Sequence, residues 1–258
     1  MMKRFSNMIG ISLLAVFFGG AIAEFPLLAQ QGAAVAQAST PKTKSSKPRR
    51  SYNPPPKPKR STGKYTSTGS RTVCPDTPLK LTAIVPHEID PSNGAMLVWS
   101  QVAAKTPTLL IYVPYVAATA FPTRLVIEDE KLNRLKRVPL KLPAKPGLVR
   151  VTLPSDIQLE AGKAYRWSYE VQCGNALDDV YGWFQVVPAE AALTQKLEGA
   201  TPVAQAEIYA QNGYWYDAVD ILAKQRKINP ADSNVKALWK TLLQDEELCE
   251  YMNQMLVE

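Results

Sequence analysis

The sequence predicts a β + α protein: an antiparallel β-sandwich of the immunoglobulin or fibronectin type III kind, followed by a C-terminal helical module. Two observations lead to this prediction. Short runs rich in β-branched and aromatic residues recur between residues 73 and 188, separated by Pro, Gly and Asn. After Pro188 the apolar residues recur at helical spacing instead. We therefore expect a sandwich domain at residues 73–188 and a helical module at residues 189–258.

The first 38 residues have the layout of a secretory signal peptide. Lys3 and Arg4 precede an uncharged apolar run from Met8 to Ala23. Small residues allow cleavage after Ala23 or after Ala38, and we prefer Ala38. The alternative is an uncleaved membrane anchor, although the run is short for a span of about 20 residues. We expect an exported protein, periplasmic or extracellular in the cell envelope, that contacts the membrane only through this leader if it stays uncleaved.

Residues 39–72 are predicted to form a disordered basic linker. They contain ten Lys and Arg but no Asp or Glu, and almost no aliphatic residues that a core could bury. Two roles stay open: a spacer, or an arm that contacts anionic polymer. Export and the sparse aromatic residues of this stretch disfavour nucleic acid as the partner. The candidate polymer-contacting cations are Lys47, Arg49, Arg50, Lys57, Lys59 and Arg60.

Seven runs with strand-like composition build the predicted sandwich. Pro139 lacks an amide hydrogen, so its strand should lie at a sheet edge. The stretch "LEAGKAYRWSYEV", with Leu159, Gly162 and Tyr165, resembles the entry to a strand of fibronectin type III domains. In those domains the tyrosine hydroxyl bonds to nearby backbone. The predicted strands are 79–86, 108–115, 123–130, 135–142, 147–154, 163–173 and 181–187.

Four helices are expected after Pro188. The first covers 193–197, and the second begins with Thr201 as its cap and ends at Gly213. The third covers 216–227, and Asp232 or Ser233 caps the fourth. The second and third fit one tetratricopeptide repeat, but no copy follows at the 34-residue period. Because stable arrays need about three repeats, we expect a single structural hairpin rather than a binding array.

Cys74, Cys173 and Cys249 are the cysteines of the chain. An oxidising compartment favours one pair. We prefer Cys74 with Cys173, because both lie at predicted strand edges of the same domain. The alternative is three buried thiols. Cys249 would be the unpaired residue.

Residues suited to catalysis are few. His87 is the single histidine and is expected in a surface loop, which disfavours histidine triads and multi-histidine zinc sites. The acidic residues at 128–130 and at Asp178 and Asp179 are expected in strand connections, and they lack the spacing of a calcium loop. We therefore predict no catalytic residue, no cofactor and no metal site.

Aromatic residues are numerous. Tyr214 and Tyr216 flank Trp215 and cannot all point inward from one helix, so these two tyrosines are candidate surface anchors. This observation supports an alternative function, a carbohydrate-binding or carbohydrate-active protein that uses an aromatic face and loop carboxylates.

Several stretches of the sequence together resemble one protein family. The phrases "CPDTPLKLTAIVP", "LLIYVPY", "GLVRVTLP", "LEAGKAYRWSYEVQC" and "AEIYAQNGYWYDAVDILAKQRKINP" together resemble the domain of unknown function 928 family, which is largely cyanobacterial. The resemblance covers about Cys74 to Leu243. It implies an exported protein of one architecture, and the family has no established activity to transfer. We expect a non-catalytic envelope protein with an interaction or scaffolding role, whose partner is an unknown protein or envelope polysaccharide.

Overall fold

The computed structural model describes residues 50–68, 74–104 and 106–257. The predicted signal peptide, Lys47 and Arg49 lie outside this part of the chain. Within the described residues, the strand-rich and helical regions belong to one compact unit.

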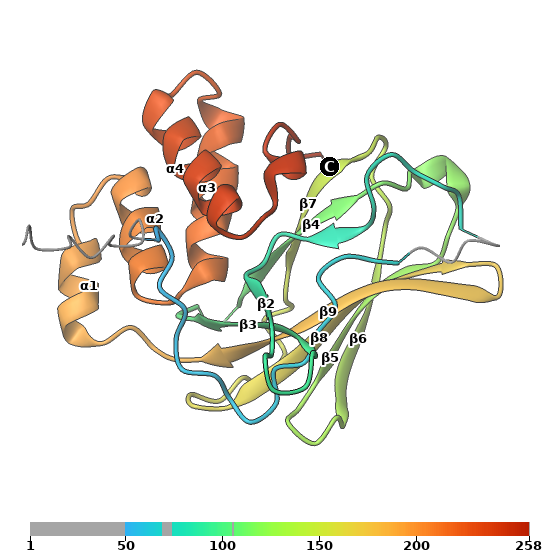
Figure 1. Cartoon of the computed structure of the whole chain (residues 1–258), viewed down its shortest axis with the longest axis horizontal. Coiled ribbons are helices and arrows are strands. Elements are labelled where there is room, and N and C mark those ends of the chain that lie inside the picture. The colour runs from blue at the N-terminus through green and yellow to red at the C-terminus, as the bar shows by residue number, and fades with distance from the viewer. Residues whose placement is uncertain (1–49, 69–73, 105, 258) are drawn as a thin grey trace, which may run out of the picture. The chain divides into compact units, whose positions relative to one another are not determined.

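The described strands precede the α-helices in chain order (Figure 1). The strands are β1 (Thr82–Ala83), β2 (His87–Ile89), β3 (Met96–Val102), β4 (Thr108–Val113), β5 (Thr123–Glu128), β6 (Arg134–Leu140), β7 (Gly147–Thr152), β8 (Ala164–Cys173) and β9 (Ala176–Val186). The helices are α1 (Ala191–Leu197), α2 (Pro202–Gln211), α3 (Trp215–Ile228) and α4 (Ser233–Asp245), with 3₁₀ turns η1 (Ala117–Thr119) and η2 (Cys249–Tyr251).

The strands form two sheets. One has the order β1-β4-β7 and the other the order β2-β3-β9-β8-β5-β6. Most neighbours pair antiparallel, but β3 pairs parallel with β9, with Trp99 opposite Trp183. The β + α class is therefore confirmed, while the prediction of a wholly antiparallel sandwich is wrong. That parallel pairing depends on β3, which the sequence prediction missed together with β2.

Pro139 lies in β6 at the edge of the larger sheet, as predicted. Between the sheets, β8 buries Tyr165, Trp167, Tyr169 and Val171, each no more than 3% exposed. The hydroxyl of Tyr165 accepts a hydrogen bond of 2.8 Å from the backbone N–H of Glu160, so the predicted tyrosine-to-backbone bond is present.

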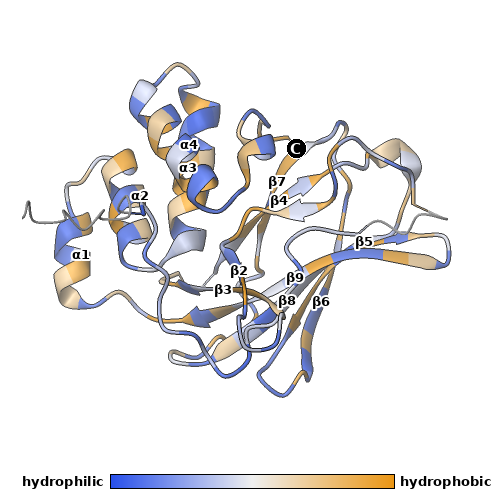
Figure 2. Ribbon diagram, viewed as in Figure 1, coloured by the Kyte–Doolittle hydropathy of each residue, from blue (hydrophilic) through white to orange (hydrophobic). Residues whose placement is uncertain are grey.

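The helices begin where their caps were predicted. Thr201 Oγ1 accepts from the N–H of Ala204 at the start of α2, and Asp232 Oδ1 accepts from the N–H of Asn234 at the start of α4. Gly213 between α2 and α3 has φ +85°, a left-handed conformation that favours glycine. Coloured by hydropathy, the helices carry apolar and polar residues along their length (Figure 2).

A second core lies where the helices pack on β4 and its neighbours. It includes Trp215, Leu222 and Trp239 from α3 and α4, with Leu110 and Tyr112 from β4. On α4 the residues Val235, Trp239, Leu242 and Leu243 recur at helical spacing and are buried here. The helical module therefore covers an outer apolar face of the smaller sheet, because β4 is buried at every position.

The predicted disulfide is present. Cys74 and Cys173 form a disulfide bond that joins positions 99 residues apart in sequence, and their Cα atoms lie 5.2 Å apart. Cys249 is exposed and has a free thiol.

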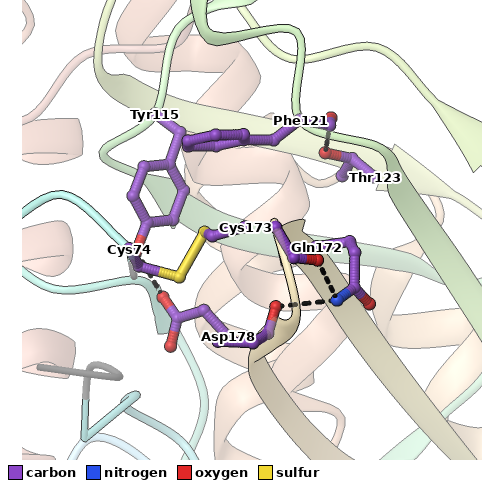
Figure 3. Close-up of a disulfide and its surroundings, with 9 residues drawn as sticks. Cys74, Tyr115, Phe121, Thr123, Gln172, Cys173 and Asp178 are labelled. Atoms are coloured by element: carbon purple, nitrogen blue, oxygen red, sulfur yellow. Dashed lines mark hydrogen bonds between the residues drawn. A yellow bond between two sulfur atoms is a disulfide. The ribbon is translucent and has the colours of Figure 1, made fainter. Parts of the chain in front are cut away.

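Figure 3 shows Tyr115 beside this disulfide bond, where its hydroxyl donates a 2.6 Å hydrogen bond to Asp178. Asp178 is 1% exposed and lies within β9. Its predicted place in a strand connection is therefore wrong.

Candidate functional site

The segment of residues 50–68, here called the N-terminal strap, lies against the folded body. Its first anchor is at the helices, where Ser51 N donates to Asp245 Oδ2 at 2.7 Å and Asn53 N donates to Ala210 O at 3.1 Å. Between them Tyr52 is completely buried and packs edge-on against Trp215, with ring centroids 5.1 Å apart. The Tyr52 hydroxyl donates to Ser100 Oγ at 3.0 Å.

The strap then continues along the sheets (blue in Figure 1). Gly63 N donates to Met96 O at 2.9 Å, and Lys64 N donates to Tyr181 O at 2.8 Å. Gly63 approaches so closely that a Cβ added to it would lie 2.4 Å from the Cβ of Val98. The prediction of a disordered linker is therefore wrong for residues 50–68. Buried Tyr52 and backbone pairing with strands stabilise a segment whose overall composition is typical of disorder.

Ordering of the strap places two of its cations in a surface hollow of about 320 Å³, here called the basic hollow. Arg60 Nη1 donates to the backbone oxygen of Glu130 at 2.9 Å, which holds the strap beside the β5–β6 hairpin. Lys59, Arg60 and Lys131 supply the positive charge of this hollow. The remaining lining residues are Pro58, Glu130, Ala164 and Trp183.

The acidic groups near the basic hollow are already engaged. Glu130 Oε1 accepts from the N–H of Ala164 at 2.9 Å. Asp129 accepts hydrogen bonds from the Asn133 side chain and from the backbone N–H groups of Asn133 and Lys131 in the hairpin turn. These hydrogen bonds, that of the Asn133 side chain first, hold the pKa of Asp129 below its ordinary value. Asp129 and Glu130 thus lie in the turn between β5 and β6, as predicted, whereas Glu128 is the last residue of β5 and its predicted place in the turn is wrong. Further exposed cations follow on and after β6, at Arg134, Arg137 and Lys141.

A second cavity, of about 420 Å³, lies between the strap and the edge of the larger sheet. We call it the Glu246 pocket, after a carboxyl group that is only 5% exposed. Its walls are mainly apolar, and it lies beside Tyr52 at the point where the strap leaves the helices. The lining residues are Arg50, Tyr52, Pro54, Pro55, Pro56, Lys57, Pro86, His87, Glu88, Leu97, Trp99 and Glu246.

Burial raises the pKa of Glu246 to about 7. Its single hydrogen bond within the described residues is a long one, 3.3 Å from the backbone N–H of His87 to Oε2. His87 itself lies in β2 rather than in the predicted surface loop, and its ring stacks on Tyr65 with centroids 3.5 Å apart. Burial lowers the pKa of His87, so the imidazole is neutral at pH 7.

Sequence reasoning missed Glu246, although a signal for it exists. The apolar stripe of α4 runs through Trp239, Leu242 and Leu243, and position 246 continues it at helical spacing. An acidic residue at a core-facing position indicates a carboxyl group forced into burial.

The two predicted surface anchors are buried instead. Tyr214 is 5% exposed and Tyr216 is 1% exposed. The Tyr216 hydroxyl accepts from Trp167 Nε1 at 2.9 Å and donates to Trp183 O at 3.1 Å, which joins α3 to the larger sheet. Tyr214 precedes the helix and packs against Tyr209, so flanking tyrosines need not share one helical face. The prediction of exposed anchors is therefore wrong.

Within residues 50–68, 74–104 and 106–257, no three His, Cys, Asp or Glu side chains gather as a metal-binding group. In the same ranges no helix has the length and apolarity needed to cross a membrane.

The family model for Domain of Unknown Function (DUF928) matches residues 66–256. The chain belongs to this family. Comparison of this DUF928 protein with curated proteins and with solved structures gave no match. The match begins inside the strap, so Tyr52, the anchor at the helices and both strap cations of the basic hollow precede the region that the DUF928 model covers.

Proposed function

We propose that this DUF928 protein is an exported, non-catalytic envelope protein that contacts anionic polymer through the basic hollow and the neighbouring cations of β6. The observation that carries the proposal is the bond between Arg60 and the backbone of Glu130, which sets Lys59, Arg60 and Lys131 in one hollow. Fixed cations lose less conformational entropy on binding than cations on a disordered arm, so they bind more tightly at equal charge.

The chemistry of the hollow suits a carboxylate or sulfate group carried on a saccharide chain. Three cations face one carboxylate that is already hydrogen-bonded to backbone. Pro58 supplies apolar surface for a sugar ring beside those charges. The partner we propose is an acidic envelope polysaccharide, and the leader at residues 1–38 would direct the protein to it.

Two finer classifications belong to the same proposal. We assign the paired sheets to the immunoglobulin or fibronectin type III kind, supported by the bond from Tyr165 to the backbone of Glu160. We assign α2 and α3 to a single tetratricopeptide-like hairpin, supported by the buried small residues Ala206, Ala210 and Ala218 at their contact. Neither assignment implies a ligand.

The carbohydrate-active alternative has less support. Its aromatic anchors, Tyr214 and Tyr216, are buried, and Asp178 is bonded to Tyr115 in the core. Asp179 pairs with Lys64 at 2.8 Å. The carboxylates that it requires therefore lie in separate places and are engaged in other contacts.

Binding of the full chain to dextran sulfate, with uncharged dextran for comparison, tests the proposal. We expect binding to dextran sulfate alone, weakening as salt screens the charges. A triple variant, Lys59→Ala with Arg60→Ala and Lys131→Ala, should bind roughly 10- to 100-fold more weakly, because each cation near an anionic surface contributes about 1 kcal/mol.

The matched control removes three exposed lysines elsewhere, by Lys196→Ala, Lys236→Ala and Lys240→Ala in α1 and α4. It changes the net charge equally and should retain most of the binding. Equal losses in both triple variants would show a general charge effect and overturn the proposal, as would equal binding to uncharged dextran.

A further inference from the structure

We propose that the Glu246 pocket binds an organic ammonium ion: an amino group carried on an apolar body, such as the side chain of a lysine. This site is separate from the basic hollow and does not depend on the function proposed for it. The proposal uses the shape of the cavity, the unpaired carboxyl group in its wall and the apolar character of the remaining walls.

Glu246 has no counter-ion among the residues that the structure describes. Glu246 is 5% exposed, yet no basic side chain of the described residues lies within ion-pair distance of it. Buried carboxylates are ordinarily paired, because an unpaired one carries the full cost of desolvation. A ligand ammonium would supply both the charge and the hydrogen bonds that this carboxyl lacks.

The charged side chains that the structure describes near Glu246 do not form an ion pair with it. Lys57 is occupied by an ion pair with Glu88 across the pocket. Asp245 is hydrogen-bonded to the backbone of Ser51. Arg50 lies exposed at the pocket and attracts Glu246 electrostatically, while Glu88 and Asp245 oppose ionisation of Glu246. The charged residues of the pocket lining are therefore the acidic Glu246 and Glu88 and the basic Arg50 and Lys57, of which Lys57 and Glu88 are already paired with each other.

The walls favour the apolar body of such a ligand. Pro54, Pro55 and Pro56 of the strap face Leu97 and Trp99 of β3. Proline offers no backbone donor, so these walls supply little for the many hydroxyls of a neutral sugar. A volume of about 420 Å³ accommodates a short alkyl chain with its head group.

His87 can take a further hydrogen of the ammonium group. Its Nδ1 lies 3.3 Å from Val85 O, an arrangement that suits a proton on Nδ1 and leaves Nε2 as an acceptor. The neutral imidazole and the carboxylate are both acceptors, so the group that Glu246 and His87 could bind together is a hydrogen-bond donor. The pocket therefore prefers a donor that carries positive charge.

Protonation links binding to pH. The free carboxyl of Glu246 has its pKa raised to about 7, and an ammonium ion stabilises only the ionised form. Binding at pH 7 would therefore release protons, and the affinity should fall as the pH drops below 7. Burial lowers the pKa of His87, which keeps its imidazole neutral at pH 7.

Calorimetric titration of the full chain with N-acetyl-lysine methylamide tests the proposal. The comparison ligand is N-acetyl-norleucine methylamide, which has a similar chain without the charge. We expect the lysine compound to bind at pH 8 at least about tenfold more tightly than the norleucine compound, and Glu246→Gln to reduce its affinity by a similar factor. At pH 5.5 the wild-type affinity should fall towards that of the variant.

Glu207→Gln, an exposed residue on α2 outside the pocket, is the matched control and should bind as the wild type does. The variant with substituted Lys59, Arg60 and Lys131 should also bind the lysine compound normally, which separates this site from the basic hollow. The proposal is overturned if the lysine compound does not bind at millimolar concentration, if both compounds bind alike, or if Glu246→Gln remains folded and binds the lysine compound as tightly as the wild type does.

Discussion

At the scale of single residues, two buried carboxyl groups make the stability of this protein depend on pH. Burial raises the pKa of Glu246 from 4.5 to about 7 and that of Asp217 from 3.8 to about 6. A hydrogen bond of 2.9 Å from the N–H of Ala103 to Oδ2 of Asp217 stabilises the ionised carboxylate and partly offsets the effect of burial on its pKa. Between the ordinary and the raised pKa, each carboxyl group is protonated in the folded protein and ionised in the unfolded chain. Stability should therefore fall as pH rises from about 4 to about 7.

Glu246→Gln isolates one of these groups. A neutral amide removes the cost of ionising a buried carboxyl, so the variant should be more stable than the wild type at pH 8 by about 1–3 kcal/mol. At pH 4 the two proteins should have nearly equal stability, because Glu246 is then protonated in both states. Urea unfolding at the two pH values measures the difference, and a variant that is less stable than the wild type at pH 8 would contradict this prediction.

Residue-level signals in the sequence located the caps of the helices and the strap cations of both cavities, but not the residues that complete the cavities. Thr201 and Asp232 act on the next few residues of their own helices, so local spacing is sufficient to identify them. Glu246 and Trp99 come together only when α4 and β3 meet across the strap. The apolar stripe of α4 indicates that position 246 is buried, but nothing in either segment alone indicates that Glu246 lies near Trp99.

At the scale of elements, the N-terminal strap is the feature that composition failed to predict. Its content of Pro, Ser and Lys is typical of disorder, and that expectation considers only how much apolar surface a segment can bury. Here one ring, Tyr52, is completely buried, and backbone groups such as those of Gly63 and Lys64 pair with strand edges. A few specific contacts compensate for a composition that is otherwise unfavourable.

Tyr52→Ala measures the contribution of this ring. It removes the packing against Trp215 and leaves Ser100 without the hydroxyl bonded to it, so it should destabilise the protein by ~3–5 kcal/mol. The melting temperature should fall by roughly 10 °C. Lys59→Ala, at an exposed position of the same strap, should change it little. Equal melting temperatures for wild type and Tyr52→Ala would show that the strap does not contribute to the fold.

Strands were predicted less well than helices, for a physical reason. The sequence indicated β4 to β9 by composition, but β2 has only the residues His87–Ile89 and β3 lies between turns. β3 is paired on one side with β2 and on the other, in parallel, with β9. Pairing between distant segments decides such strands, whereas helix formation depends on neighbours in sequence.

At the scale of the whole molecule, the disulfide closes a long loop through the sandwich. Cys74 precedes β1 and Cys173 ends β8, so the bridge ties the entry of the body to the larger sheet. Replacing both by Ser should lower the free energy of unfolding by ~2–5 kcal/mol, through the greater freedom of the unfolded chain. Cys249→Ser, at the free cysteine, should leave stability unchanged. A double variant as stable as the wild type in urea would contradict the assigned role.

The proposed export and the proposed polymer binding by the basic hollow both depend on the N-terminal part of the chain. The basic residues of the strap were singled out from the sequence as candidates for polymer contact, and Lys59 and Arg60 indeed lie exposed on the surface. Lys131, which completes the hollow, could not be found in this way because it joins them only through the fold. Because residues 50–68 are part of that fold, their role in binding is better tested by substitution than by deletion.

Fractionation of the cells that make this protein tests the central claim most directly. The envelope fraction is washed at low and then at high salt, and the protein and its associated polysaccharide are measured in each wash. We predict that the wild-type protein stays with the envelope at low salt and leaves at high salt together with acidic polysaccharide. The variant lacking the cations at 59, 60 and 131 should already leave at low salt. Identical behaviour of the two proteins, or retention of the wild type at high salt, would contradict the account.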